Sequence, residues 1–502
     1  TTLPSRFDMR DWGWLTSVKN QGNKNACWAF GPSGAIESSI LRFLGMDIDL
    51  SENNMEDMSL RYFMYGMKDF KEGNSPEAAV NYALSWFGVF DEEYDVYDQL
   101  GKISPIFAVD NSIHFLDVVI VPPRQNSTDN DAMKWALLKY GALFINYHAV
   151  GPVTEQYYDG NETVNHGVTV VGWDDNREIA GAPGKGAWII KNTWGAHRLE
   201  NGFMYVSYYD TRLSTLSSSY AFPLENTVIY NKNYQYDIGG RFWYLNNSDQ
   251  YRNIYLAVDD DLIAGVGTYF NDTNVEYTIR IYVNDKLVLV QSGLSPFSGY
   301  HTVKLDSYVP IKEGDEFIVE IKSNVVPISF SSRQHYIVNS SQQFVGGEWQ
   351  DTTVDGYVNC VKAYTLADDT KVIDAKNISV DYDGGNYFSV TVVTADGHAV
   401  GAGETVKFTI DGKTSSVKTD SNGVAKIKIT NVPEKYTMTT TYNGKSVKST
   451  VTVKHVLTTS KVTVKKTAKK FTLKATLKIN GKVVKGKWIT FKFNGKTYKA
   501  KT

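Results

Sequence analysis

The spacing of apolar and polar residues divides the chain into a mixed amino-terminal part and a long β-rich part. An apolar run typical of a helix begins at Cys27, whereas the runs after His166 and before Asn192 are β-branched or aromatic and typical of strands. After about residue 222, short segments alternate between apolar and polar positions, for example Tyr277–Val283 and Glu316–Ile321. Turn residues separate these segments. The pattern predicts a domain of helices and strands followed by all-β sandwich domains.

Cys27 is one of only two cysteines among 502 residues, and its position suits a nucleophile. It begins the helical pattern, six residues after Gln21 in a segment rich in glycine and asparagine. The unpaired N–H groups and the dipole of a helix N-terminus stabilise a thiolate. Attack on a carbonyl also needs a base, a group that orients the base and a donor to the oxyanion. These parts must come from elsewhere in the chain.

The order Gln21, Cys27, His166, Asn192 resembles that of the papain family of cysteine proteases. His166 follows Cys27 by 139 residues and Asn192 follows it by 165, separations typical of that family. The resemblance runs from about residue 3 to about residue 208. Four further segments carry it, and they are Leu3–Asp8, Leu50–Asn54, Gly73–Ser75 and Gly202–Tyr208.

The resemblance implies a two-lobed α+β catalytic domain with a cleft between a helical lobe and a β lobe. Cys27 would attack the scissile carbonyl, and His166 would hold the thiolate as an ion pair and then protonate the leaving amine. Asn192 would orient the imidazole, and Gln21 would donate to the oxyanion together with the Cys27 N–H. Taken singly, a cysteine, a histidine or an asparagine is more often structural, so the prediction depends on the combination.

Three residues are predicted to contact substrate. By the same resemblance, Gly73 and Asn74 lie in a shelf that pairs with the substrate backbone. Trp194 would flank the cleft and shield the hydrogen bond between His166 and Asn192 from water.

The sequence departs from the family pattern at several positions. Lys24 and Met58 stand where many relatives have disulfide-bonded cysteines, so we expect packing alone to hold this region. Arg198–Leu199 stands where relatives usually have Trp-Gly, which affects the primed-side wall of the cleft. Cys360, the second cysteine, lies in a β-rich segment and is predicted to be a buried free thiol.

The β-rich part is predicted to contain three further domains. The segment after the protease domain resembles the lectin-like module of clostridial surface cysteine proteases, and five residues of the last third recur 83 positions later, as in immunoglobulin-like repeats. The predicted domains are 1–222 (protease), 223–367 (lectin-like), 368–453 (immunoglobulin-like) and 454–502 (a truncated second repeat). The recurring residues are Lys371, Phe388, Phe408, Gly412 and Thr419.

Charge is distributed unevenly. Residues 454–502 contain 15 lysines and no arginine, aspartate or glutamate, so the formal net charge of −3 combines +15 in this segment with −18 in the rest. The lysines suit either contact with an anionic cell envelope or protection of strand edges. No nucleic-acid-binding motif accompanies them, and no apolar run reaches the ~18 residues of a membrane span. Six Asn-X-Ser/Thr sequons and the repeats favour an extracellular or cell-surface protein.

The sequence therefore predicts a secreted or surface-tethered cysteine endopeptidase that acts on proteins or peptides, with cell-envelope glycans or surface proteins as further partners. It needs no cofactor and no catalytic metal. Calcium at Asp259–Asp261 is a weaker expectation, since a charged turn is the favoured interpretation of these residues. Two alternatives stay open, an adhesin that uses the protease fold only as a scaffold, and an enzyme that passes the acyl group to an amine and crosslinks proteins.

Overall fold

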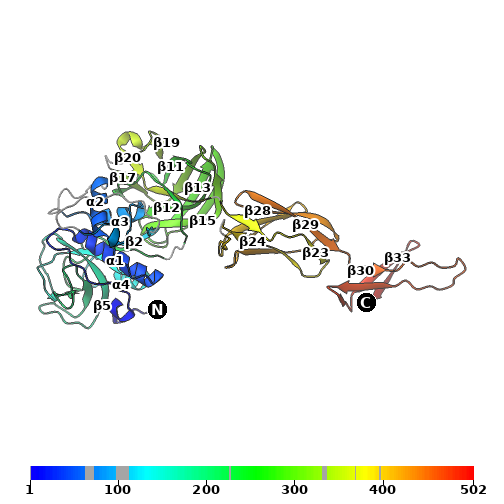
Figure 1. Ribbon diagram of the computed structural model, residues 1–502, viewed down its shortest axis with the longest axis horizontal. Coiled ribbons are helices and arrows are strands. Elements are labelled where there is room, and N and C mark those ends of the chain that lie inside the picture. Colours follow the sequence, from blue (N-terminus) through cyan, green and yellow to red (C-terminus); the bar gives the residue numbers. More distant parts are fainter. Residues whose placement is uncertain are drawn as a thin grey trace. The chain divides into compact units, whose positions relative to one another are not determined.

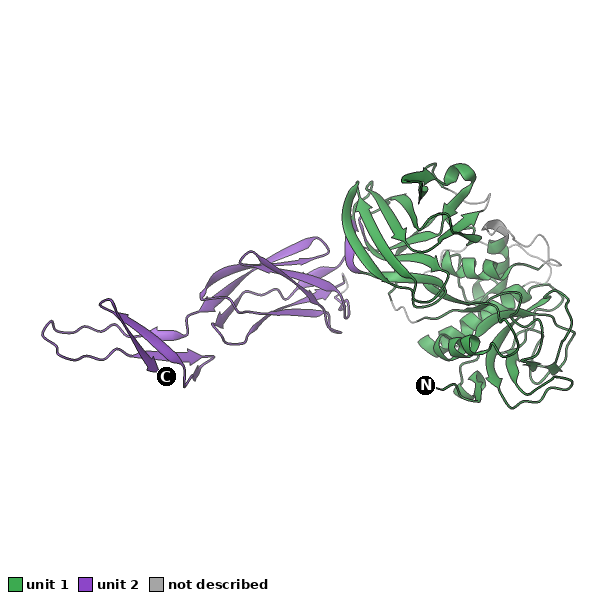
Figure 2. Ribbon diagram, turned by 180° about the vertical axis from the view of Figure 1, so that it is seen from behind, with its two compact units in different colours: residues 1–259, 263–305, 311–366 green, residues 260–262, 306–310, 367–502 purple. Residues whose placement is uncertain are grey.

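The computed structural model describes residues 2–62, 73–97, 112–224, 228–330, 336–367, 369–394 and 397–502. Contacts within the chain define two compact units (Figure 2). The first unit consists of residues 1–259, 263–305 and 311–366, and the second of residues 260–262, 306–310 and 367–502. The predicted catalytic residues all belong to the first unit. The predicted domain boundaries stay predictions, and residue 368, at one of them, lies outside the described residues.

The α-helices that the structure describes lie in the amino-terminal part of the first unit (Figure 1). They are α1 (Cys27–Leu44), α2 (Glu52–Tyr62), α3 (Pro76–Leu84) and α4 (Asp131–Lys139). The sequence explains two of their ends. The Ser75 side chain accepts from the Glu77 N–H and caps α3, with proline in its first turn. Helix α1 stops at Gly45, whose φ of 68° is left-handed.

One twelve-stranded sheet extends through the described part of the first unit. Its strand order is β4-β7-β6-β5-β3-β8-β2-β15-β12-β21-β9, and β1 pairs with β5 beside this row. The amino-terminal part supplies β1 (Arg6–Asp8), β2 (Asp117–Val121), β3 (Leu143–Tyr147), β4 (Glu155–Gln156), β5 (His166–Asp174), β6 (Ala187–Lys191), β7 (Phe203–Ser207) and β8 (Ser219–Ala221). The β-rich part supplies β9 (Lys232–Tyr234), β12 (Asp261–Phe270), β15 (Gly299–Ile311) and β21 (Val361–Ala367).

The join between the two parts of this sheet is an antiparallel pairing of β2 with β15. Gly299 lies opposite Val119, and Tyr300 lies opposite Val118. Gly299 has a φ of 137°, and a Cβ there would lie within 2.1 Å of the Val118 carbonyl oxygen. Only glycine allows the two backbones to approach this closely.

The β-rich part of the first unit adds two smaller sheets. A six-stranded sheet has the order β14-β13-β16-β11-β18-β19, and a three-stranded sheet has the order β10-β17-β20. The strands predicted at Tyr277–Val283 and Glu316–Ile321 are present in β13 and β16; buried residues alternate in β13, whereas residues 317–321 of β16 are all buried. The bounds are β10 (Trp243–Leu245), β11 (Gln250–Leu256), β13 (Glu276–Val283), β14 (Lys286–Leu294), β16 (Glu316–Lys322), β17 (Val326–Phe330), β18 (Ser341–Val345), β19 (Glu348–Asp351) and β20 (Tyr357–Asn359).

The second unit contains a sandwich of two sheets with its own core. A three-stranded sheet (β22-β24-β27) and a five-stranded sheet (β23-β29-β28-β25-β26) contribute the buried core side chains Phe388, Phe408, Met438 and Val451. The strands are β22 (Lys371–Ile373), β23 (Ile378–Asp381), β24 (Tyr387–Val393), β25 (Thr405–Ile410), β26 (Lys413–Lys418), β27 (Val424–Lys428), β28 (Glu434–Tyr442) and β29 (Lys445–Lys454). Residues after 454 form β30 (Leu457–Thr459), β31 (Ala475–Ile479), β32 (Lys482–Val483), β33 (Trp488–Phe493) and β34 (Lys496–Lys501).

Within the first unit, a close contact between α1 and strands β3 and β5 positions the cleft. Gly31 of α1 makes this contact possible, because a Cβ there would lie 2.9 Å from a ring carbon of Phe144 and 3.3 Å from the carbonyl carbon of Gly167. The Thr169 hydroxyl of β5 donates to the Gly31 carbonyl oxygen at 2.7 Å. The first turn of α1 is therefore held beside the first residues of β5.

Candidate active site

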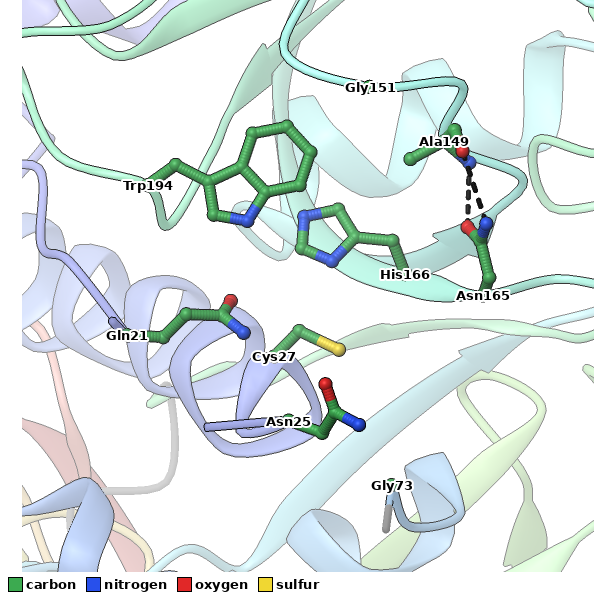
Figure 3. A pocket seen from close by; sticks show the side chains of 9 residues that line it. All are labelled: Gln21, Asn25, Cys27, Gly73, Ala149, Gly151, Asn165, His166 and Trp194. Carbon is green, nitrogen blue, oxygen red and sulfur yellow. Dashed lines mark hydrogen bonds between the residues drawn. The ribbon is translucent and has the colours of Figure 1, made fainter. Parts of the chain in front are cut away.

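A cleft of about 350 Å³ lies at the amino-terminal end of α1. Figure 3 shows the Cys27 side chain at the helix end, with the His166 imidazole above it and the Gln21 amide beside it. The residues that line the cleft are Gln21, Asn25, Cys27, Gly73, Ala149, Gly151, Asn165, His166 and Trp194. Segments far apart in the sequence thus contribute to one site.

Cys27 is the first residue of α1 and is partly exposed. Burial of the sulfur raises the pKa of the thiol, and the backbone N–H groups of Gly167, Trp28 and Cys27 itself oppose this rise. The helix terminus and the β5 backbone therefore both offer N–H groups to the sulfur.

The orientation of the His166 ring follows from its bond to Asn192. His166 Nε2 lies 2.9 Å from Asn192 Oδ1, in the buried interior behind the cleft. The Thr193 N–H also donates to this oxygen at 2.8 Å, and Asn192 Nδ2 donates to the sulfur of Met204. These contacts fix the amide with its oxygen toward the ring. Because an amide oxygen only accepts, Nε2 carries the hydrogen, and Nδ1 is the free base of the neutral ring.

Trp194 covers one face of the His166 ring. The two rings stack with centroids 4.5 Å apart and planes 14° from parallel. Burial lowers the pKa of His166 to about 4, and the bond to Asn192 opposes this shift. Burial disfavours a charge on Cys27 as well, so a thiolate and an imidazolium formed together would each compensate the desolvation of the other.

Gln21 is buried and held on three sides. Its backbone N–H donates to the Thr193 carbonyl at 2.8 Å, and its side-chain oxygen accepts from the Thr193 hydroxyl at 2.6 Å. Its Nε2 donates to the Lys24 carbonyl oxygen at 2.9 Å. An amide nitrogen has two hydrogens, so the second is left for an oxygen in the cleft.

An antiparallel bridge brings the Gln21 loop and the Asn192 loop together. Asn20 pairs with Trp194, and the Gly195 N–H donates to the Lys19 carbonyl at 2.8 Å. Because of this bridge, Gln21, the predicted oxyanion donor, and Asn192, which orients His166, lie at the same site.

The structure brings most of the predicted residues together. Gln21, Cys27, Gly73, His166 and Trp194 line the cleft. Asn192 is not among the lining residues and contacts the site through its hydrogen bond with His166. Asn74 is not among the lining residues, and its side-chain oxygen accepts from the Ser75 N–H at 2.8 Å. Its proposed contact with substrate stays a prediction.

Four residues that line the cleft were not predicted from the sequence. Asn25 and Asn165 are sequence neighbours of Cys27 and His166, and that proximity was an available signal. Ala149 and Gly151 belong to the loop between β3 and β4, and no motif marks them. Asn165 exchanges two hydrogen bonds with the Ala149 backbone, at 2.7 and 3.1 Å, and so fixes this loop (Figure 3).

The residues that depart from the family pattern have clear structural roles. The expectation that packing alone replaces a disulfide at Lys24 is wrong, because Lys24 Nζ forms a buried ion pair with Glu56 Oε2 at 2.5 Å. Leu199, where relatives usually have glycine, has a φ of 60°, the left-handed conformation that favours glycine. Cys360 is a buried free thiol, as predicted.

A group of carboxylates has the spacing of a metal site. Among the described residues, Glu37, Asp49 and Glu52 come together, but Lys19 Nζ lies 2.5 to 2.6 Å from an oxygen of each. The Lys19 ammonium group therefore supplies the positive charge among these three carboxylates. At the expected calcium segment, Asp259 pairs with Lys232 at 3.4 Å.

Comparison with known families gives two matches. Residues 3–224 match the model of the papain family of cysteine proteases, and residues 233–365 match that of the lectin-like domain. Among curated proteins, cathepsin L of Sarcophaga peregrina is 26% identical over 235 residues, covering 44% of this chain and 64% of its own length. Procathepsin L of Felis catus is 30% identical over 243 residues, covering 44% and 66%. The chain thus spans slightly less than two thirds of these relatives.

Two solved structures extend the likeness through both regions. A clostridial cysteine protease, Cwp84 after propeptide cleavage, has a TM-score of 0.63 at 22% identity and covers 72% of this chain and all of its own. The cysteine protease and lectin-like domains of Cwp84, a surface layer associated protein of Clostridium difficile, have a TM-score of 0.63 at 21% identity, covering 73% of this chain and 90% of their own. At this identity the likeness concerns the fold.

Proposed function

Because residues 3–224 form a papain-family cysteine protease domain and residues 233–365 a lectin-like domain, we propose that this protein is a cysteine endopeptidase that hydrolyses peptide bonds through an acyl-enzyme. One observation carries the proposal. The Asn192 amide oxygen holds Nε2–H of His166, so that Nδ1 is the free nitrogen in a cleft that also contains the Cys27 sulfur and the Gln21 amide.

In the first half of the reaction, the Cys27 thiol transfers its proton to Nδ1 of His166, which gives a thiolate and an imidazolium. The thiolate attacks the scissile carbonyl carbon, a C–S bond forms, and the carbonyl oxygen becomes an oxyanion. The second N–H of Gln21 Nε2 and the Cys27 backbone N–H, which has no acceptor within the helix, donate to that oxygen. As the C–N bond breaks, His166 Nδ1 protonates the leaving amine.

In the second half, neutral His166 accepts a proton from a water molecule that attacks the thioester carbon. The C–S bond then breaks, the carboxylic acid product leaves, and the thiolate and imidazolium are restored. Each oxyanion donor contributes about 3–4 kcal/mol to transition-state stabilisation in comparable sites.

The two cysteines of the chain make a direct test possible. We expect an epoxysuccinyl peptide to alkylate Cys27 in the folded, reduced protein, whereas Cys360, which has no exposed surface, provides the internal control. Peptide mass mapping locates the label, and turnover of an unfolded protein substrate is compared with that of Cys27→Ala. An unlabelled Cys27, or equal turnover by the alanine variant, would contradict the proposal and favour the adhesin alternative.

We further place the protein outside the cell or at its surface. The proposal is supported by the likeness in fold to a surface layer associated protein and by the sequons and repeats of the sequence. Within the described residues, no helix has both the length and the apolar character needed to cross a membrane. Surface proteins and cell-envelope glycans are accordingly the proposed partners, and fractionation of the source cells tests the location.

A further inference from the structure

The loop from Lys19 to Ala26, which carries the oxyanion donor Gln21, is fastened to helix α2 by two lysines. Lys19 pairs with Glu52 at 2.5 Å, and Lys24 pairs with Glu56 at 2.5 Å. Glu52 and Glu56 are four residues apart in α2, so their side chains lie on one face of the helix. That face points toward the loop.

The Lys24–Glu56 pair is unusually well buried. The Lys24 side chain is 1% exposed and that of Glu56 is fully buried. Gly22, Asn23 and Asn25 are exposed, so Lys24 is the one buried residue of positions 22–25. Removal of one partner from such a pair leaves an uncompensated buried charge and is strongly destabilising.

The pair acts on the oxyanion donor through a single carbonyl group. The Lys24 carbonyl oxygen accepts from Gln21 Nε2 at 2.9 Å and from the Ala26 N–H at 2.8 Å. The Lys24 carbonyl thus fixes the nitrogen side of the Gln21 amide, as the Thr193 hydroxyl fixes its oxygen side, and so sets the direction of the second N–H. Tyr97 also holds this loop, since its hydroxyl donates to the Gln21 carbonyl oxygen at 2.5 Å.

We propose that the buried Lys24–Glu56 ion pair positions the Gln21 amide for transition-state stabilisation, and that an ionised Glu56 is required for the full rate. The inference rests on the proposed cysteine endopeptidase function. Lys24 and Glu56 are positioning residues, because they touch neither the substrate nor the sulfur and act only through Gln21.

Titration of Glu56 supports this role. Burial raises the pKa of Glu56 to about 7, Lys24 opposes the rise, and Asp57 and Asp95, the other charged groups that face it, add to it. Above this pH the pair is ionised and holds the loop. Below it Glu56 is protonated, and the attraction to Lys24 weakens.

The decisive variant replaces both charges with apolar side chains, Lys24→Met/Glu56→Leu, because removal of a whole buried pair generally preserves folding. We expect kcat for a peptide substrate to fall about tenfold while KM changes less than about twofold, as for an interaction made only in the transition state. In a Gln21→Ala background the same two substitutions should lower kcat by less than about twofold, since the donor they position is already gone. The ratio of wild-type to double-variant kcat should increase from pH 6 to pH 8.

Alkylation of Cys27 by iodoacetamide separates positioning from general damage. This reaction forms a C–S bond and releases iodide without an oxyanion, so its rate should stay within about twofold of wild type in the double variant. Lys134→Met, which breaks an ion pair with Asp175 in the β lobe, is the matched control and should leave kcat unchanged. Equal losses in alkylation and kcat, or an unchanged kcat, would overturn the inference.

The same experiments distinguish failure of this inference from failure of the proposed function. If Cys27→Ala retains turnover, the endopeptidase proposal itself is lost. If Cys27→Ala is inactive but the double variant matches wild type, or its effect persists undiminished without Gln21, only the role of the ion pair is refuted.

Discussion

The two reacting side chains are individually unsuited to carrying charge. Burial raises the pKa of the Cys27 thiol and lowers that of His166 to about 4. Each shift favours the neutral form at neutral pH. A reactive thiolate at Cys27 therefore depends on a cation beside it, and the two groups should titrate as a coupled pair rather than separately.

Replacement of His166 by alanine tests this dependence. With the partner gone, the raised pKa of Cys27 keeps the thiol protonated up to alkaline pH, so the rate of alkylation by iodoacetamide at pH 6.5 should fall at least about tenfold. The rate should then rise with pH, because the thiolate fraction increases as pH approaches the thiol pKa. A full pH profile of labelling in wild type and variant makes the measurement.

Asn192→Ala is a useful companion to that experiment, since it leaves the imidazole in place but removes the fixed acceptor of Nε2–H. We expect the alkylation rate of this variant to lie between those of wild type and His166→Ala. If His166→Ala reacts at pH 6.5 as fast as wild type, the thiolate is stabilised by the helix terminus alone and the coupled pair is refuted.

Among the elements, the contact of α1 with β5 sets the geometry of the site. Cys27 belongs to α1 and His166 to β5, so the distance between the two side chains depends on how closely the helix packs against the strand. Gly31 determines how closely they approach, because its missing Cβ leaves room for Phe144 and for the Gly167 backbone. Gly31 lies four residues, or about 6 Å of helix rise, from Cys27, so we expect it to affect catalysis without touching substrate.

Gly31→Ala should push α1 away from β5 and lower kcat about 10²-fold, since a misplacement of about 1 Å can cost that much. Gly34→Ala is the comparison variant in the same helix and should lower kcat less, because its Cβ would meet the Thr169 side chain alone, with Oγ1 at 3.0 Å, and neither Phe144 nor the β5 backbone. Peptide hydrolysis and thermal unfolding of both variants provide the comparison. Equal activities in the two variants would show that the helix position is not set at Gly31.

In the whole molecule, the protease and lectin-like regions share one sheet. Strand β2 of the first region pairs with β15 of the second, and the ion pair between Glu77 of α3 and Arg241 links them again at 3.0 Å. Separation would expose the apolar residues of β2, which are buried throughout the strand. An uncovered apolar strand edge promotes aggregation.

Two truncations test this dependence. A chain of residues 1–224 should be insoluble or aggregate on refolding, because the β2 edge is uncovered. A chain of residues 1–366 keeps the pairing and should retain kcat/KM for a short peptide within about twofold of the full chain, since the sandwich around Phe388 and Phe408 has its own core. Size-exclusion chromatography and peptide turnover measure both. A soluble, fully active 1–224 chain would contradict the prediction.

Much of the catalytic set was predictable from sequence, because the chemistry constrains residue types and their order. A nucleophile at a helix start, a histidine opening a strand and an asparagine before a turn are visible as local patterns. The roles of Gln21, Cys27, His166 and Asn192 came from their combined order, which resembles that of the papain family. Strand β13 was likewise visible, since its alternate burial requires alternate apolar residues. Strand β16 was predicted from the same kind of pattern, but only the structure shows that its residues 317–321 are all buried.

Only the tertiary structure decided which distant groups meet. The pairing of Lys24 with Glu56 depends on how a loop lies across a helix, and no local pattern distinguishes it from a solvated lysine. The lining by Ala149 depends on a loop fold with no chemical signature. Burial has the same origin, because the pKa of a side chain responds to neighbours from anywhere in the chain. The sequence by itself determined the chemical groups and their order, and packing determined their distances, their solvation and hence their charge.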